Sequence, residues 1–263
     1  MRILVTNDDG INAPGIKILN QIASELAGPQ GDVWLVAPES EQSGVGHCIN
    51  YINPTRVSKV SSQKIAIQGS PADCVLAGLH YISKKGKPDL ILSGINKGNN
   101  SGENTIYSGT VGAAMEGALQ GIPSIALSQY FGPENINLEN PFEAASQFGV
   151  SLIMDIYKKT NWGDGGYKTF YNVNFPPVQS INVKGTRVVS QGLRNTKFNV
   201  EPAIAPNGRE FLWIKGNRQD IPTEIGTDVH ANLNGYISVT PMTCNLTSYE
   251  LIDDLKKKLE CEK

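Results

Sequence analysis

The sequence predicts a three-layer, Rossmann-like α/β fold in which helices cover both faces of a mostly parallel sheet. Short segments rich in Val, Ile and Leu alternate with segments whose apolar residues recur at helical spacing. The short segments lack a strict alternation of apolar and polar residues, which is typical of strands buried on both faces. Because a helix follows most strands, right-handed crossovers between parallel strands are expected.

The first half of the chain contains most of this pattern. Strands are expected at residues 2–6, 33–37, 64–68, 90–93 and 122–128, and helices at 16–26, 71–82 and 110–120. The helix that begins at Pro71 has the clearest start. Ser70 can cap it, Pro suits its first turn, and Asp73 is favoured near the positive end of the helix dipole.

The pattern changes in the second half. A helix is expected over about 141–159, strands at 169–175, 187–191 and 236–240, and a Lys-rich terminal helix over 247–259. Within a stretch rich in Pro, Asn and Gly, segments 196–200 and 210–215 can pair as a hairpin. We therefore divide the chain into a Rossmann-like catalytic core (1–190), a C-terminal β-hairpin arm or oligomerisation insertion (191–230), and a final strand and helix (231–263).

Composition limits the class of protein. The 263 residues carry 23 Lys and Arg against 25 Asp and Glu, so the formal net charge of −2 gives no overall attraction to nucleic acid. No apolar run is long enough to span a membrane, and no secretory signal is recognisable. Four scattered cysteines do not suggest a disulfide framework or a zinc site. We expect a cytoplasmic protein that binds neither DNA nor membranes.

Polar loops follow the predicted parallel strands, and such loops form the ligand sites of open α/β sheets. The first strand ends in Asn7-Asp8-Asp9-Gly10, where two adjacent carboxylates repel each other unless a hard cation such as Mg²⁺, Mn²⁺ or Ca²⁺ neutralises them. An Asx turn with a helix cap is the alternative explanation of this motif. In the loop after the second strand, Ser43 offers a neutral hydroxyl ligand, although a plain polar surface loop explains this segment better when it is taken alone.

The loop after the 90–93 strand carries Gly94, Gly98 and Gly102 with interleaved Asn residues, and Asn96 can offer a carbonyl oxygen to a hard cation. It leads to Ser108-Gly109-Thr110, directly before a helix rich in Ala and Gly. Hydroxyls and free N–H groups at a helix start form a phosphate site, although ordinary capping explains the same residues. These loops together favour a divalent metal beside a phosphate, which suits hydrolysis of a phosphate monoester.

Other common site motifs are missing from the sequence. It contains no G-x-G-x-x-G after the first strand, no G-x4-G-K-[ST], no H-E-x-x-H and no G-x-S-x-G. A dinucleotide site, a P-loop, a zincin site and an α/β-hydrolase elbow are therefore not expected. Two alternatives to a nucleotide phosphatase stay open. One is a non-catalytic regulator that binds a nucleotide or phosphate, and the other is a metallohydrolase that acts on polyphosphate or a sugar phosphate.

The ordered set of motifs resembles the SurE (stationary-phase survival protein) family from residue 1 to about 242. The matching segments are residues 1–11, 37–38, 42–44, 69–75, 93–98, 107–114, 172–176 and 235–241. The similarity is weakest over about 191–228. His230 stands where the family usually has an aromatic residue, and Arg194 is the only Arg in a stretch that is usually Arg-rich.

This resemblance implies a 5′-nucleotidase that converts nucleoside 5′- and 3′-monophosphates to nucleoside and phosphate, with some exopolyphosphatase activity. It implies one divalent metal per subunit, Mg²⁺ or Mn²⁺, and assembly into homodimers or homotetramers through the arm and the C-terminal extension. Asp8 and Asp9 would be catalytic, with Asp8 the preferred proton relay. The implied metal ligands are Asp8, Asp9, Ser43 and Asn96, and the implied phosphate-binding residues are Ser108, Gly109, Thr110 and Asn96.

Overall fold

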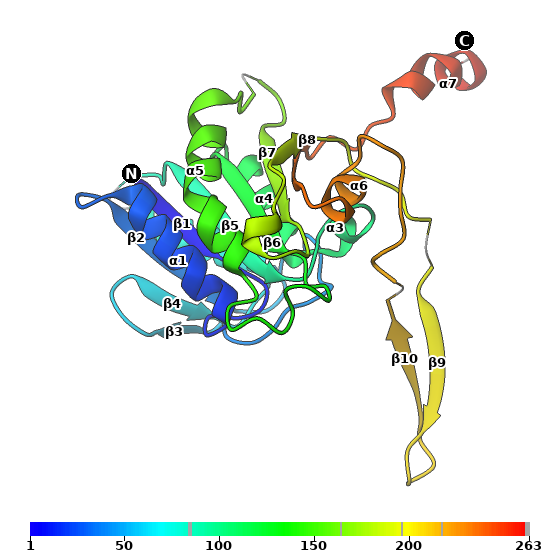
Figure 1. Ribbon diagram of the computed structural model, residues 1–263, viewed down its shortest axis with the longest axis horizontal. Coiled ribbons are helices and arrows are strands. Elements are labelled where there is room, and N and C mark those ends of the chain that lie inside the picture. Colours follow the sequence, from blue (N-terminus) through cyan, green and yellow to red (C-terminus); the bar gives the residue numbers. More distant parts are fainter. Residues whose placement is uncertain (84–85, 164, 196, 217, 261–263) are drawn as a thin grey trace.

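The computed structural model has a nine-stranded sheet with helices on both faces and a two-stranded hairpin that projects from the body of the molecule (Figure 1). It describes residues 1–83, 86–163, 165–195, 197–216 and 218–260. The strand order is β3-β4-β2-β1-β5-β6-β7-β11-β8. The six strands from β4 to β7 pair in parallel, and β8 is parallel to β11. Strands β3 and β11 run antiparallel to β4 and β7.

Most bounds in the core follow the predicted segments closely, but β5 runs to Lys97, four residues beyond the predicted 90–93, so Asn96 lies in the strand and not in a loop. The strands of the main sheet are β1 (Arg2–Thr6), β2 (Asp32–Pro38), β3 (Val57–Lys59), β4 (Lys64–Ile67), β5 (Leu90–Lys97), β6 (Ser124–Gln129), β7 (Thr169–Phe175), β8 (Thr186–Val188) and β11 (Ile237–Thr243). The hairpin pairs β9 (Asn199–Ile204) with β10 (Glu210–Lys215). The α-helices are α1 (Pro14–Ala27), α2 (Pro71–Ile82), α3 (Asn104–Tyr107), α4 (Gly109–Leu119), α5 (Glu143–Lys159), α6 (Asp228–Leu233) and α7 (Ile252–Leu259).

The predicted three layers are confirmed. Helices α1 and α5 pack together over one face of the sheet, and α2 and α4 pack together over the other. Each face has its own buried apolar cluster, which includes Ile16 and Leu19 of α1 on one side and Val75 of α2 on the other. The start of α2 is also as predicted, because Ser70 and Asp73 bond each other reciprocally in a capping box.

The hairpin and its second strand lie where the sequence predicts them, but the bounds predicted for the first strand are wrong. Segment 196–200 was predicted to pair with 210–215, whereas β9 begins at Asn199 and runs to Ile204; Thr196 lies outside the described residues. The tight turn pairs Ile204 with Glu210 and thereby fixes the register. Pro202 lies inside β9, and a Pro is unusual in a strand except at an edge or a bulge.

Candidate metal and phosphate site

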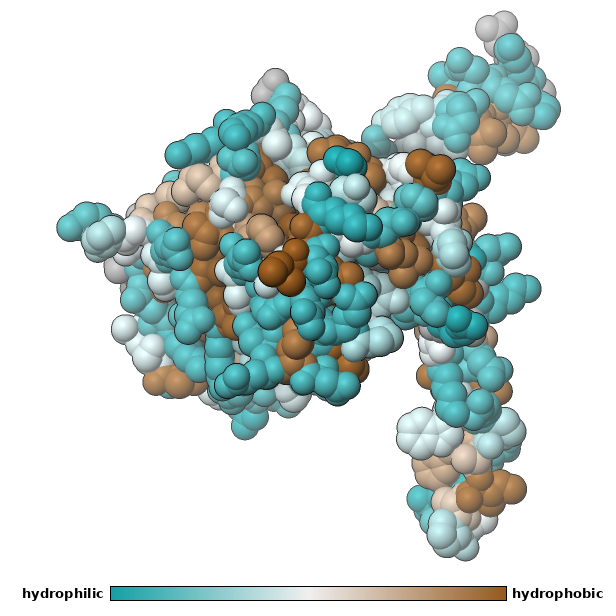
Figure 2. Space-filling view, viewed as in Figure 1, coloured by the Kyte–Doolittle hydropathy of each residue, from teal (hydrophilic) through white to brown (hydrophobic). Residues whose placement is uncertain are grey.

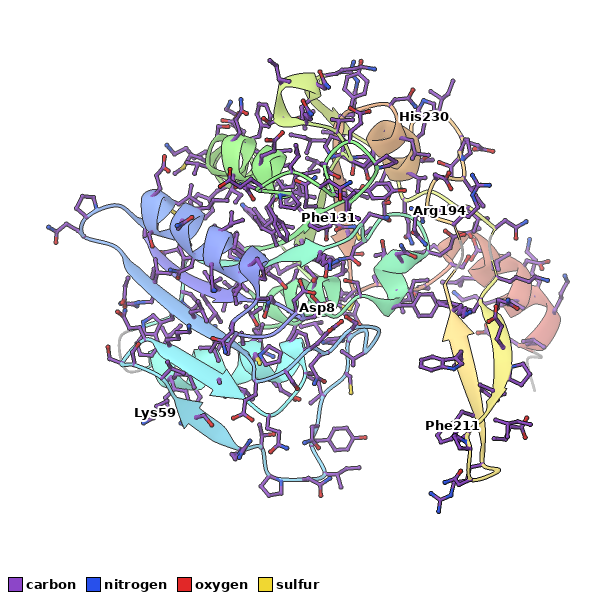
Figure 3. The ribbon with its side chains drawn as sticks, turned by 60° about the horizontal axis from the view of Figure 1, so that its bottom comes forward. Asp8, Lys59, Phe131, Arg194, Phe211 and His230 are labelled. Carbon is purple, nitrogen blue, oxygen red and sulfur yellow. The ribbon has the colours of Figure 1, made fainter. Side chains whose placement is uncertain are left out.

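The carboxyl ends of β1 and β5 and the start of α4 bring the predicted site residues together. Asp8, just after β1, is buried and accepts two hydrogen bonds from Thr110, at 2.5 Å from its Oγ1 and at 3.2 Å from its backbone N. Asp9 accepts a hydrogen bond of 3.1 Å from the backbone N of Lys97, the residue after Asn96. Asp8 lies at this edge of the sheet in Figure 3. Two acidic residues therefore lie beside a helix N-terminus.

Gly109 allows α4 to begin this close to Asp8. A Cβ atom at position 109 would lie 3.0 Å from the Cβ of Asp8 and 3.0 Å from the Cγ of Pro71. Both distances are shorter than ordinary van der Waals contact between carbon atoms. Any side chain at this position would therefore push the helix start away from the carboxylate.

The two neutral candidates differ in how firmly the structure fixes them. The Asn96 side chain donates from Nδ2 to the carbonyl of Gly98 at 3.0 Å, which leaves its Oδ1 to act as a ligand. Ser43 is exposed, and its hydroxyl donates to Glu41 at 2.7 Å rather than to the other candidate ligands. The Ser43 loop is nevertheless anchored at the site, because the backbone N of Gln42 donates to the carbonyl of Asp8 at 2.7 Å.

The electrostatics of the pair favour a bound cation. Burial raises the pKa of Asp8 from its usual 3.8 to about 6, with repulsion from Asp9 adding to the effect and the Thr110 hydrogen bonds opposing it. Burial, together with nearby Glu41, also raises the pKa of Asp9. Among the described residues no group of three or more His, Cys, Asp and Glu could hold a metal ion. A metal here would therefore use two carboxylates and neutral oxygens, a donor set that fits Mg²⁺ or Mn²⁺.

The raised pKa of Asp8 gives a prediction for the metal-free protein. Its carboxyl binds a proton more tightly in the folded state than in the unfolded state, so its contribution to stability is lost as the pH rises from about 4 to about 6. The loss is about 3 kcal/mol at 1.36 kcal/mol per pKa unit. Urea unfolding in EDTA should show that the free energy of unfolding falls across this range more in the natural protein than in Asp8→Asn. Parallel curves for the two proteins would contradict the assignment.

Ser108 caps helix α4, as the alternative explanation of this motif predicts. Its buried Oγ accepts a hydrogen bond of 3.1 Å from the backbone N of Val111 at the start of α4. The hydroxyl proton is still available to a ligand. The N–H of Gly109, at the first position of the helix, has no partner within the helix. These two donors can hold an anion, whereas the Thr110 hydroxyl is directed at Asp8.

A set of contacts that was not predicted from the sequence holds the loop between Asn96 and Ser108. We call Arg194 and Asp228, which lie at the base of the arm, the arm-base clamp. Arg194 is buried and donates to the carbonyl of Ser101 at 2.9 Å and to Asn99 Oδ1 at 2.9 Å. Asp228 is fully buried and accepts hydrogen bonds from the backbone N of Gly102 at 2.9 Å, Gly192 at 2.8 Å and Val229 at 2.7 Å.

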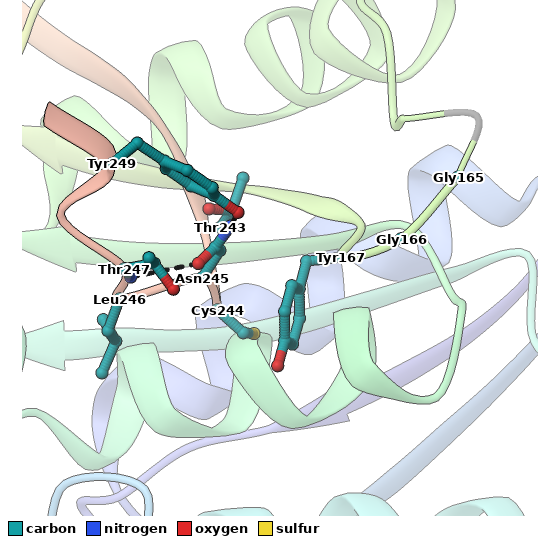
Figure 4. A pocket seen from close by; sticks show the side chains of 9 residues that line it. All are labelled: Gly165, Gly166, Tyr167, Thr243, Cys244, Asn245, Leu246, Thr247 and Tyr249. Atoms are coloured by element: carbon teal, nitrogen blue, oxygen red, sulfur yellow. Dashed lines mark hydrogen bonds between the residues drawn. The ribbon is translucent and has the colours of Figure 1, made fainter. Parts of the chain in front are cut away.

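A separate cavity of about 750 Å³ lies near the carboxyl end of β11, away from this site (Figure 4). The nine described residues that line it carry no charged side chain, and Asn245 Nδ2 donates to the Tyr249 hydroxyl at 2.6 Å. Such a lining offers nothing to neutralise a phosphate. No helix in the described part of the chain is long and apolar enough to cross a membrane.

Comparisons with known proteins identify the family of the chain. The family model described as "Survival protein SurE" matches residues 3–198. The chain is 58% identical over 263 residues to "5'-nucleotidase SurE" of Jannaschia sp. (strain CCS1), which covers 99% of this chain and 100% of that protein. The protein of the same name from Roseobacter denitrificans is 58% identical over 256 residues, with 97% and 98% covered.

A solved structure gives the same result. The "Crystal Structure of Sure Protein from Aquifex aeolicus" superposes with a TM-score of 0.79 at 37% identity and covers 98% of this chain and 99% of that one. A family model that matches most of the chain, close relatives along its full length and a shared fold all lead to one conclusion. The chain belongs to the SurE family.

Proposed function

We propose that this protein is a metal-dependent phosphomonoesterase that hydrolyses nucleoside 5′-monophosphates, and also 3′-monophosphates, to a nucleoside and inorganic phosphate. The observation that carries the proposal is the contact of buried Asp8 with Thr110 at the start of α4, beside Asp9 and Asn96. Relatives that are 58% identical bear the name 5'-nucleotidase.

The side chains divide the work. Asp8, Asp9, Asn96 and Ser43 would hold the metal, and a bound divalent cation supplies positive charge for the phosphoryl oxygens and lowers the pKa of water. Ser108 and the N–H of Gly109 would hold the phosphate, and we assign Asn96 to both the metal and the phosphate. Thr110 orients Asp8 through its hydroxyl and its backbone N–H, and Asp8 is also the residue to which we assign the proton relay.

The direct test is phosphate release from a panel of substrates. The panel contains the 5′- and 3′-monophosphates of the four common nucleosides, a sugar phosphate and polyphosphate, each with Mg²⁺, Mn²⁺ or EDTA. We expect turnover of the nucleoside monophosphates only with a metal. Nucleotide binding without turnover would favour the non-catalytic regulator, and turnover of polyphosphate or sugar phosphate alone would favour the other metallohydrolase.

We further propose a cytoplasmic homo-oligomer, with the segment 191–230 as its assembly element. The described cysteines Cys48, Cys74 and Cys244 are unpaired, which is usual in a reducing compartment. In the space-filling view, brown apolar side chains lie among hydrophilic ones along the arm (Figure 2). Phe211 and Trp213 of β10 are 55% and 63% exposed, and two residues apart in a strand they lie on one face. Two large aromatic side chains exposed on one face of a strand are typical of an interaction surface.

The arm gives a prediction about assembly. Light scattering after size-exclusion chromatography should give the natural protein the mass of a dimer or tetramer, and the Phe211→Ser, Trp213→Ser double variant a smaller mass. Val60→Ser is the matched control, because Val60 is 59% exposed but lies in the turn between β3 and β4, away from the arm. Equal masses for the double variant and the natural protein would contradict a role of the arm in assembly.

A further inference from the structure

We propose that the cavity beside Phe131 is the subsite for the nucleobase of the substrate, an inference that rests on the proposed function. This cavity of about 500 Å³ lies between the start of α1, the loop after β6 and the start of α5. We call it the Phe131 cavity. Asp9 and Lys97 are among its lining residues, so it is continuous with the candidate metal site. Figure 3 shows Phe131 and Asp8 on the same side of the molecule.

The position of the cavity matches the geometry of the reaction. Its walls come from segments at the carboxyl ends of β1, β5 and β6, the edge at which open α/β sheets bind ligands. If Ser108 and Gly109 hold the phosphate, the rest of the substrate can extend past the Asp9 carboxylate. Its leaving group, the nucleoside, then lies in this cavity. The volume lies within the range of small-molecule sites.

The chemistry of the walls suits a flat aromatic ring. Phe131 is half-buried and lies edge-to-face against Phe142, with ring centroids 5.0 Å apart and an interplanar angle of 69°. This contact fixes the plane of the Phe131 ring before any ligand binds, so little side-chain entropy is lost on stacking. Every nucleobase has a π-face, so stacking on an aromatic side chain tolerates all of them.

The start of α1 forms an adjoining part of the lining, because a Cβ atom at Gly15 would lie 3.3 Å from the ring of Phe142. The same Cβ atom would lie 1.9 Å from the carbonyl oxygen of Ile95, which shows how tightly the start of α1 packs against β5. Pro14 at the first position of α1 lines the cavity next to this contact. The Phe131 ring and the start of α1 are therefore both held in place, and Glu139 adds a polar side chain to the lining for the edge of a base.

A larger cavity of about 930 Å³ shares Ser108 with the phosphate turn, but its lining includes neither Asp8 nor Asp9. It extends along the flank of α4 to Phe170 and Met242. These residues are paired with each other at the amino end of β7, away from the edge that holds Asp8 and Asp9. A base at this far end would lie away from the carboxylates, and a base at the Ser108 end is what Ile106→Ala tests.

The experiment compares adenosine 5′-monophosphate with ribose 5-phosphate, which has the same reacting group but no base. In Phe131→Ala, kcat/KM for the nucleotide should fall about tenfold, mainly through KM, while that for ribose 5-phosphate stays within twofold. Phe131→Tyr keeps the ring and should restore nucleotide turnover. Ile106→Ala, in the larger cavity, should leave the ratio of the two substrates unchanged.

Each other outcome has a definite meaning. An unchanged nucleotide kcat/KM in Phe131→Ala, an equal loss on both substrates, or a selective nucleotide loss in Ile106→Ala would overturn the assignment of the base to the Phe131 cavity. Each of these results leaves the nucleotidase itself intact. If the natural protein releases phosphate from neither substrate with either metal, the proposed function fails, and the base subsite fails with it.

Discussion

Asp8→Asn is expected to lower kcat/KM for nucleoside 5′-monophosphates by at least about 10³-fold, equivalent to about 4 kcal/mol of transition-state stabilisation. The substitution removes one of the two carboxylates at the start of α4 and leaves Asp9 as the remaining charged candidate ligand. Two charges hold a divalent cation far better than one, and the reaction depends on positive charge near the phosphoryl oxygens. Because Asp8 is buried, a water molecule cannot easily take the place of its carboxylate as a ligand of the metal.

The fold should survive this change. An Asn side chain has nearly the same shape, and its oxygen can still accept the Thr110 hydroxyl proton. Circular dichroism and urea unfolding would establish this, with Asp155→Asn as the matched control, because Asp155 is exposed and pairs with Lys159 at 2.8 Å on the surface of α5. The control should keep full activity. The natural protein in EDTA should lose activity and regain it with Mn²⁺ or Mg²⁺. An Asp8→Asn enzyme with more than a tenth of the natural activity would contradict the assignment.

The convergence of the site could be predicted because it follows from topology. Asp8 comes directly after β1 and Asn96 lies at the end of β5, and these strands are parallel neighbours in the sheet. Strand ends of this kind meet at one edge whatever the details of packing. The start of α4 at Gly109 was predicted to within one residue, because the cap residue Ser108 precedes a run of small, helix-compatible residues. The cap is a local signal.

The contacts of the arm could not be predicted in this way. Arg194 bonds to Ser101 across 93 residues of sequence, and Asp228 bonds to Gly102 across 126. No periodicity or local motif encodes such separations. Helix α6 had a usable signal in Thr227, whose side chain caps it, but the helix has only six residues and was missed. The first strand of the hairpin was predicted too early in the chain, because Pro202 is a residue that normally argues against a strand.

Asp228→Ala is expected to destabilise the folded protein by about 3–5 kcal/mol, the usual cost of removing one member of a buried charged network. The fully buried carboxylate accepts three backbone N–H groups, from Gly102, Gly192 and Val229, and none of them has water as a replacement. The change also removes a negative charge that lies close to the buried Arg194 guanidinium. Urea unfolding at neutral pH measures the loss.

The kinetic constants of the Asp228 variants show whether Asp228 positions the loop between Asn96 and Ser108 or only stabilises the fold. The clamp holds the loop that connects Asn96 to Ser108, so its release should lower kcat more than it raises KM, even at a temperature where the variant is fully folded. Asp228→Asn keeps one side-chain oxygen and should lie between Ala and the natural residue in both measurements. Asp253→Ala, on exposed α7, should stay within about 0.5 kcal/mol of the natural protein. A loss below about 1 kcal/mol in Asp228→Ala would show that the arm-base clamp does not hold the loop between Asn96 and Ser108.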